Sequence, residues 1–338
     1  MSSLETAFMQ SVIDHLNNIL SRLSPSSGMH AVTSRILQKL CVRMEALPKM
    51  LHLIEAEIHK TSDKPLGNGG FATVYLGQYR ELAVALKCYY IADKTRAQAI
   101  YEIFCKEALQ WRRLQHKNIT PFLGVTTVIS PLCLVSKWMK NGTIISSLQN
   151  NPDLDRLPLL VDIGKGLEYL HSFQFVHGDL KGENILIDEH SHACLCDFGV
   201  ATVMYDPQIM QAVTKTRQSD GTTRWQAPER LDPEEFGNDP DYEPFTSDIY
   251  SLSMVVWEIF AGEIPFVEFQ YEGTVINQVL NKGKRPSRTE DMIKLGLTDD
   301  IWAIVEEGWR TNWRERPPLN RILDVFTHAA TSRSVLAH

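Results

Sequence analysis

The sequence predicts an α+β fold in which a small antiparallel β-rich lobe precedes a larger α-helical lobe, with a helical leader before both. Three observations lead to this prediction. Apolar residues recur every three to four positions near the amino terminus, short β-branched runs follow from about residue 61, and long helical patterns dominate after about residue 140. A chain of 338 residues that is 43% hydrophobic can bury a core of that size.

The leader, expected over residues 1–56, contains two amphipathic helical patterns. The first covers residues 4–23 and breaks at Ser24–Gly28, and the second runs from Val32 to the stop signal at Pro48. An apolar stripe at helical spacing usually packs on a neighbouring domain, and we expect that here. Binding of a regulator is the alternative.

Periodicity changes along the rest of the chain. Strands are expected at residues 72–76 and 82–87 with a turn at Gly77, and again at 126–128 and 132–136. Helices are expected at residues 97–115, 157–171 and 246–260.

Composition argues against several classes of partner. The formal net charge of −7 carries no basic signature, so we expect neither nucleic acid nor an anionic membrane as a partner. The six cysteines lack metal-ligand spacing and favour reduced, buried thiols in a cytoplasmic protein. The amino terminus has no signal-peptide pattern, and the most apolar stretch, residues 254–267, contains two glutamates.

A glycine-rich segment precedes a lysine on an apolar strand. In Leu66–Val74 the small residues would let the backbone approach phosphates, although such a segment alone is more often an ordinary hairpin. Lys87 follows 13 residues after Val74, and a charge there needs an anionic partner. Glu107, 20 residues on in a helical pattern, can supply it.

Polar residues then recur in a fixed order. His177-Gly178-Asp179 precedes Asn184 by five residues, Asp197-Phe198-Gly199 comes 13 residues after Asn184, and Ala227-Pro228-Glu229 ends a turn-rich segment. Any one of these could be a turn or a cap. Together and in order they resemble the protein kinase family, of the serine/threonine type and similar to the tyrosine-kinase-like branch found in fungi. The resemblance covers residues 61–328 and places the two lobes at about 61–139 and 140–328.

This resemblance implies transfer of the γ-phosphoryl group of MgATP to a serine or threonine hydroxyl of a protein substrate. Asp179 would be the catalytic base, Lys181 would neutralise the transferring group, and Asn184 and Asp197 would bind Mg²⁺. Lys87, paired with Glu107, would orient the ATP phosphates. The implied nucleotide-binding residues are Leu66, Gly67, Asn68, Gly69, Gly70, Val74, Ala85, Lys87, Ser136, Lys137, Met139, Leu186 and Asp197.

The resemblance also implies scaffold roles. Thr222 would bond the catalytic loop, Asp248 would anchor the backbone of that loop, and Arg316 would pair with Glu229.

The sequence departs from the family pattern in places. Gly178 replaces the arginine that senses a phosphorylated activation loop, so we expect no switching through an arginine–phosphate contact. Ala72 replaces the third glycine, and segments 200–220 and 232–243 are long. Two alternatives remain open: a pseudokinase scaffold, and a small-molecule phosphotransferase similar to aminoglycoside and choline kinases, which the His-Gly-Asp string resembles.

Overall fold

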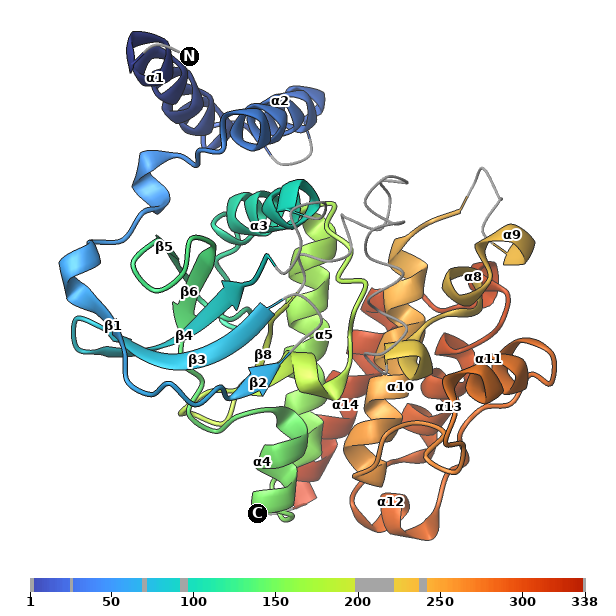
Figure 1. Cartoon of the computed structure of the whole chain (residues 1–338). Helices are drawn as coiled ribbons and strands as arrows, with labels where there is room; N and C mark the ends of the chain where they lie inside the picture. Colours follow the sequence, from blue (N-terminus) through green and yellow to red (C-terminus); the bar gives the residue numbers. More distant parts are fainter. Residues whose placement is uncertain are drawn as a thin grey trace. The chain divides into compact units, whose positions relative to one another are not determined.

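The computed structural model describes residues 3–24, 27–68, 72–91, 97–197, 222–236 and 242–336. The chain divides into two compact units (Figure 1). Among the described residues, the first unit holds those up to His116 together with Thr120–Trp138, and the second holds Lys117–Ile119, Met139 to Asp197 and those from Thr222 onward. Within the described ranges, no helix is long and apolar enough to cross a membrane.

The first unit is built on an antiparallel sheet with strand order β1-β3-β4-β6-β5, and β2 pairs with β3. Buried apolar side chains on one face of the sheet form its core, among them Val84 and Leu86 from β4 and Val135 from β6. The strands are β1 (Ile58–Lys60), β2 (Gly67–Asn68), β3 (Ala72–Tyr79), β4 (Leu82–Tyr89), β5 (Phe122–Thr126) and β6 (Cys133–Lys137).

The predicted turn at Gly77 is wrong. Gly77 lies inside β3 opposite Val84, and the turn falls at Arg80 and Glu81, where Arg80 adopts a left-handed φ of 55°. A Cβ atom on Gly77 would sit 2.5 Å from Leu86 Cδ1 and 2.9 Å from the His59 carbonyl oxygen. Glycine is therefore needed there for the close approach of neighbouring strands.

The strand predicted at residues 126–128 is also wrong in its position, because β5 already ends at Thr126. The cross-strand register of β5 with β6 shifts between Phe122 and Gly124, so this edge strand is irregular.

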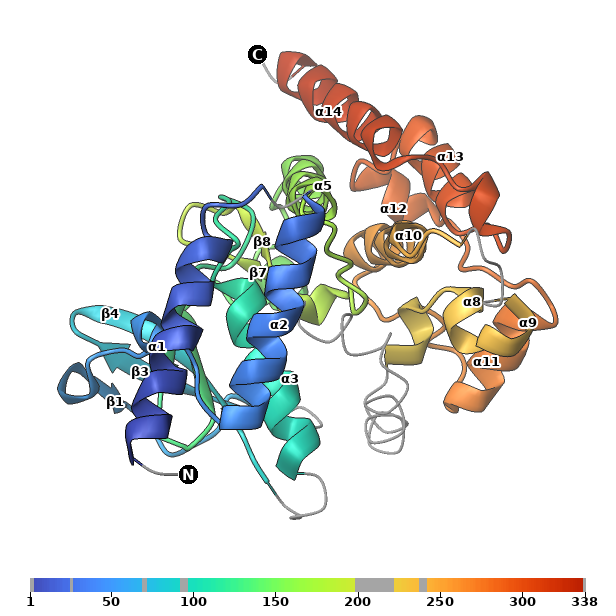
Figure 2. The same ribbon diagram turned by 90° about the horizontal axis from the view of Figure 1, so that it is seen from above.

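The leader forms two helices, α1 (Ser3–Leu20) and α2 (Gly28–Met44), which lie side by side in both views (Figure 2). α2 also packs on α3 (Ala97–Trp111) of the same unit, as the packing interpretation expects. α2 ends at Met44, before the predicted stop at Pro48, because Glu45 takes a left-handed φ of 50° and its N–H bonds the carbonyls of the last turn.

The leader runs on through two short 3₁₀ turns, η1 (Lys49–Leu51) and η2 (Glu55–Glu57), into β1. The Asp14 carboxylate accepts a hydrogen bond from the Lys49 backbone N–H at 2.8 Å, and the Gln10 amide donates to the Leu47 carbonyl at 3.0 Å. These bonds tie α1 to the segment that follows α2.

The second unit is helical around α10 (Phe245–Ala261), whose residues from Ser247 to Phe260 are all buried. α5 (Arg156–Ser172) packs against both α10 and α14 (Leu319–Leu336). The helices predicted at 157–171 and 246–260 are confirmed, each extended by one residue at both ends. The other helices in the described part of this unit are α4 (Ile144–Asn150), α8 (Pro228–Leu231), α9 (Pro233–Phe236), α11 (Glu272–Leu280), α12 (Glu290–Lys294) and α13 (Asp299–Gly308).

A two-stranded sheet, β7 (Ile185–Ile187) and β8 (Ala193–Leu195), lies in the second unit. Among its described residues this unit also contains the 3₁₀ turns η4 (Gly182–Asn184), η5 (Thr222–Trp225) and η6 (Trp313–Glu315). η4 begins three residues after Asp179 and runs into β7, so the polar segment singled out in the sequence is a loop that leads into a short strand.

Candidate functional site

The lysine on β4 has the predicted anionic partner. Lys87 Nζ lies 2.8 Å from Glu107 Oε1, and the Glu107 side chain, which comes from α3, is 1% exposed. The Tyr89 hydroxyl donates a second hydrogen bond to the Glu107 carboxylate. A buried carboxylate with two donors is held in one place, which in turn fixes the lysine ammonium.

One face of the first-unit sheet gathers four of the predicted nucleotide-binding residues. Val74 on β3 is the register partner of Lys87, and Ala85 on β4 is the partner of Ser136 on β6. Directly opposed residues share a face, and so do residues two apart in a strand. Lys137 is the partner of Val84, so its side chain lies on the opposite, core face of the sheet.

Leu66 and Gly67 approach Val74 at the edge of the same sheet. Gly67 on β2 pairs with Val74, and the Leu66 N–H donates to the Val74 carbonyl at 2.9 Å. Asn68 pairs through its backbone with Thr73. Gly69, Gly70 and Phe71 lie outside the described residues.

In the second unit, Asp179 and Asn184 form a buried pair. Asn184 Nδ2 donates to the Asp179 backbone carbonyl at 2.7 Å and to Asp179 Oδ2 at 3.0 Å. Asp179 Oδ1 is buried and has no hydrogen-bond partner among the described residues. A fixed carboxylate with one free, buried acceptor atom is suited to receive a proton.

Asn184 and Asp197 fit a magnesium ion by their donor types. Both donors of the Asn184 amide point at Asp179, which leaves its oxygen Oδ1 for a cation, and Cys196 N–H donates to the Asn184 carbonyl at 3.0 Å, which brings the neighbouring Asp197 close. Among the described residues, no group of three or more His, Cys, Asp or Glu side chains could hold a metal. Mg²⁺ typically takes one or two protein oxygens and completes its shell with phosphate and water.

Lys181 lies among three carboxylates. Burial by itself lowers the pKa of Lys181, but the charges of Asp179, Glu183 and Asp197 outweigh it, so the pKa is raised and the ammonium stays protonated. Its Nζ is 3.2 Å from Glu183 Oε2 and donates to Thr222 Oγ1 at 3.4 Å. The predicted contact of Thr222 with the catalytic loop is confirmed.

Asp248 anchors the backbone of the same loop, as predicted. Its carboxylate accepts from the N–H groups of His177 and Gly178, both at 2.8 Å, and lies 2.9 Å from His171 Nε2. Burial raises the pKa of Asp248, but the bond with His171 and the backbone N–H groups prevail, so the pKa is lowered. Gly178 has a φ of 71°, a conformation that glycine adopts without strain.

Sequence reasoning missed Glu258 as a part of this loop. Its Oε2 accepts from the Gly182 N–H at 2.9 Å and from Trp225 Nε1 at 2.8 Å, so one carboxylate in α10 joins the catalytic loop to η5. Burial raises the pKa of Glu258 to about 7. The signal available was a glutamate within an apolar helix, where a charge is costly.

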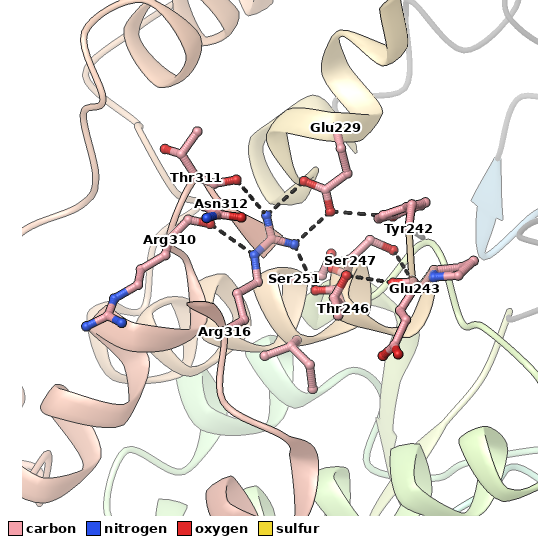
Figure 3. A network of polar contacts seen from close by, with 12 residues as sticks. Glu229, Tyr242, Glu243, Thr246, Ser247, Ser251, Arg310, Thr311, Asn312 and Arg316 are labelled. Carbon is pink, nitrogen blue, oxygen red and sulfur yellow. Dashed lines mark hydrogen bonds and ion pairs between the residues drawn. The ribbon is translucent and has the colours of Figure 1, made fainter. Parts of the chain in front are cut away.

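Arg316 and Glu229 form the predicted ion pair (Figure 3). The guanidinium donates two hydrogen bonds to the carboxylate, at 2.7 and 2.8 Å, and both side chains are buried. Backbone carbonyls of Arg310, Thr311 and Thr246 accept its other N–H groups. Tyr242 also donates to Glu229, at 3.4 Å.

Two further predicted residues, Leu186 and Met139, lie near the start of α4, whose N-cap is Thr143. Leu186 in β7 forms an isolated bridge with Thr143. Met139 is buried, and its carbonyl accepts from the Gly142 N–H at 3.1 Å. Phe198, Gly199 and the long segments 200–220 and 237–241 lie outside the described residues.

Comparison with known protein families decides the assignment. Residues 61–326 match the family described as protein tyrosine and serine/threonine kinase. The chain belongs to the protein kinase family.

Relatives of this kinase are serine/threonine-protein kinases by name. It is 28% identical to serine/threonine-protein kinase STY46 of Arabidopsis thaliana over 271 residues, which cover 78% of this chain and 43% of the relative. It is 28% identical to TNNI3K of Rattus norvegicus over 309 residues, 89% of this chain and 34% of the relative. It is 31% identical to a probable serine/threonine-protein kinase of Dictyostelium discoideum over 272 residues, 79% of this chain and 27% of the relative. The kinase thus spans less than half the length of these relatives.

Proposed function

We propose that this kinase transfers the γ-phosphoryl group of MgATP to a serine or threonine hydroxyl of a protein. The observation that carries the proposal is the Asp179–Asn184 pair, in which Asp179 Oδ1 is buried without a partner among the described residues. The names of the relatives support serine/threonine specificity.

Asp179 acts as the base in this proposal. Asn184 holds Asp179 Oδ2 through a hydrogen bond of 3.0 Å, so that Oδ1 faces the acceptor hydroxyl and takes its proton as the oxygen attacks phosphorus. Asp248 holds the backbone just before Asp179 through two N–H groups, so the base is fixed from both sides.

Two lysine side chains bind the phosphates of ATP in this proposal. Lys87, oriented by Glu107, binds the α- and β-phosphates, and Lys181, whose pKa is raised by its acidic neighbours, neutralises the transferring group. Asn184 Oδ1 and Asp197 are the magnesium ligands that we propose. Magnesium, when bound, neutralises the negative charge that develops on the phosphate oxygens.

The nucleotide-binding residues that we propose include the sheet face with Val74, Ala85 and Ser136, which is continuous with Lys87. The others are Leu66, Gly67, Asn68, Gly69, Gly70, Lys137, Met139 and Leu186. A cytoplasmic location is part of the proposal and is supported by six free cysteines.

The test is phosphoryl transfer from radiolabelled ATP with Mg²⁺ to a generic protein acceptor such as casein, with choline and an aminoglycoside assayed in parallel. We expect the wild type to label serine or threonine of casein, and Asp179→Asn to lower the rate by about 10²-fold or more, without lowering the unfolding midpoint. Asp153→Asn, which changes an exposed aspartate of the same unit, is the matched control and should keep full activity.

Three results would contradict the proposal. Unimpaired transfer by Asp179→Asn would show that Asp179 is not the base. Labelling of choline or the aminoglycoside but not of casein would show that the chain is a small-molecule phosphotransferase. No transfer by the wild type, together with no thermal shift on addition of ATP and Mg²⁺, would make it a scaffold.

A further inference from the structure

Two cysteines face each other in the core of the first-unit sheet. Cys88 on β4 and Cys133 on β6 are register partners, and their Sγ atoms lie 3.3 Å apart. Cys88 is 7% exposed and Cys133 is fully buried, and both are free thiols. They lie on the core face, so the mechanism proposed above does not use them.

The register places this pair where a disulfide can form. The Tyr89 N–H donates to the Leu132 carbonyl at 2.8 Å, so Tyr89 and Leu132 are a hydrogen-bonded pair of the antiparallel ladder. The next pair along, Cys88 and Cys133, is therefore a non-hydrogen-bonded pair. In such pairs the Cα atoms are about 4.5 Å apart, which falls within the range of about 4.4–6.8 Å that disulfides span.

We propose that Cys88 and Cys133 are a modification site at which hydrogen peroxide forms a disulfide between β4 and β6. In the first step the Cys88 thiolate attacks one peroxide oxygen and the O–O bond breaks, which leaves a sulfenic acid and a hydroxide that takes up the proton released by the thiol and becomes water. The Cys133 sulfur then attacks the Cys88 sulfur, the S–O bond breaks, and the oxygen leaves as a second water. Two thiols are oxidised and one peroxide is reduced.

The order of the two steps follows from the surroundings of the two sulfurs. The hydrogen bond between Cys88 and Cys133 lowers the pKa of Cys88 against the effect of burial, and the positive charge of Lys60 acts in the same direction. The same hydrogen bond and burial raise the pKa of Cys133. Because the thiolate is the nucleophile, Cys88 reacts with peroxide first and Cys133 resolves the product.

Burial decides both which oxidant acts and which cysteines respond. Both cysteines are buried, so the oxidant has to be small, and a bulky one such as oxidised glutathione is excluded. Cys41 and Cys105 are equally buried, but burial raises the pKa of both, that of Cys41 to about 12, so they are poor nucleophiles.

The experiment is a non-reducing peptide map of the full chain before and after treatment with hydrogen peroxide. Remaining thiols are blocked with iodoacetamide before digestion. Trypsin releases Cys88 in residues 88–94 and Cys133 in residues 118–137, and each peptide holds a single cysteine. We expect these two peptides joined, with a mass about 2 Da below their sum and lost on reduction.

Variants separate this site from adventitious oxidation. Cys133→Ala should abolish the linked peptide and leave Cys88 as a sulfenic or sulfinic acid. Cys105→Ala, which changes a buried cysteine elsewhere in the same unit, should leave the linked peptide unchanged. If Cys133→Ala fails to fold, the wild-type map alone still decides.

Two results would overturn the proposal. One is recovery of both peptides alkylated from wild type in which peroxide has oxidised other cysteines. The other is a glutathione adduct on Cys88 after treatment with oxidised glutathione, because it would show an accessible thiol instead of an enclosed pair. Neither result depends on whether the chain transfers phosphate, so the outcome is independent of the proposed function.

Discussion

Arg316 donates two hydrogen bonds to the carboxylate of Glu229 across 87 residues of sequence, and neither side chain is more than 1% exposed. Glu229 is the second residue of α8, four residues after η5, and Arg316 follows η6. The pair therefore fastens the end of the turn-rich segment to the carboxyl-terminal helices of the second unit.

Arg316→Ala should lower the free energy of unfolding by about 3–5 kcal/mol, because it leaves the Glu229 carboxylate buried and unpaired. Arg321→Ala is the matched control: Arg321 also makes two hydrogen bonds to a carboxylate, that of Glu307, but its side chain is 55% exposed. Its loss should cost about 0–1 kcal/mol. Urea denaturation measures both, and equal losses would contradict the assigned role.

Gly77→Ala should lower the free energy of unfolding by about 1–3 kcal/mol, since the added methyl group overlaps Leu86 Cδ1 and the His59 carbonyl in the sheet. Gly273→Ala in α11 serves as the control, because a Cβ atom there meets nothing within 4 Å. Alanine in a helix should stabilise by about 0.5–1 kcal/mol. Opposite shifts of the thermal midpoint are expected, and a stabilising Gly77→Ala would refute the close-approach argument.

Gly77 also shows where sequence reasoning reaches its limit. Period and composition located the helices around residues 157–171 and 246–260, since a long apolar pattern at helical spacing has few other solutions. A lone glycine fits two different structures, because the absence of a Cβ atom is needed both in some turns and where two strands approach closely. Only the register with β4 and β1 distinguishes them, and register is a tertiary property.

The candidate site also contains residues that the sequence could predict and one that it could not. Asp179, Asn184 and Lys87 could be singled out because their order and spacing form a motif, and the pairs Lys87–Glu107 and Asp179–Asn184 are present. Glu258 belongs to no motif. Its donors are a backbone N–H 76 residues away and an indole 33 residues away, so the glutamate in an apolar helix indicates that a partner is needed but does not identify it.

Glu258 makes the stability of the second unit depend on pH in a direction that can be worked out. Its pKa is about 7 in the folded protein, against an ordinary value of 4.5, because the carboxyl group is buried. Below pH 4.5 both states carry the proton. Between the two values the folded state holds a proton that the unfolded state has released, so the free energy of unfolding falls as the pH rises from 4.5 to about 7 and levels off above that, where both states are ionised.

Glu258→Gln should remove this pH dependence, because the amide keeps an acceptor for Gly182 and Trp225 and never ionises. The shift from 4.5 to about 7 corresponds to a loss on the order of 3 kcal/mol in the wild type between pH 4.5 and pH 8. Urea denaturation at pH 5 and pH 8 gives the difference in free energy of unfolding between wild type and variant at each pH. The histidines are common to both proteins, so their contributions cancel in this difference. The wild type should lose stability relative to the variant at pH 8, and a difference that is the same at both pH values would show that Glu258 does not titrate in this window.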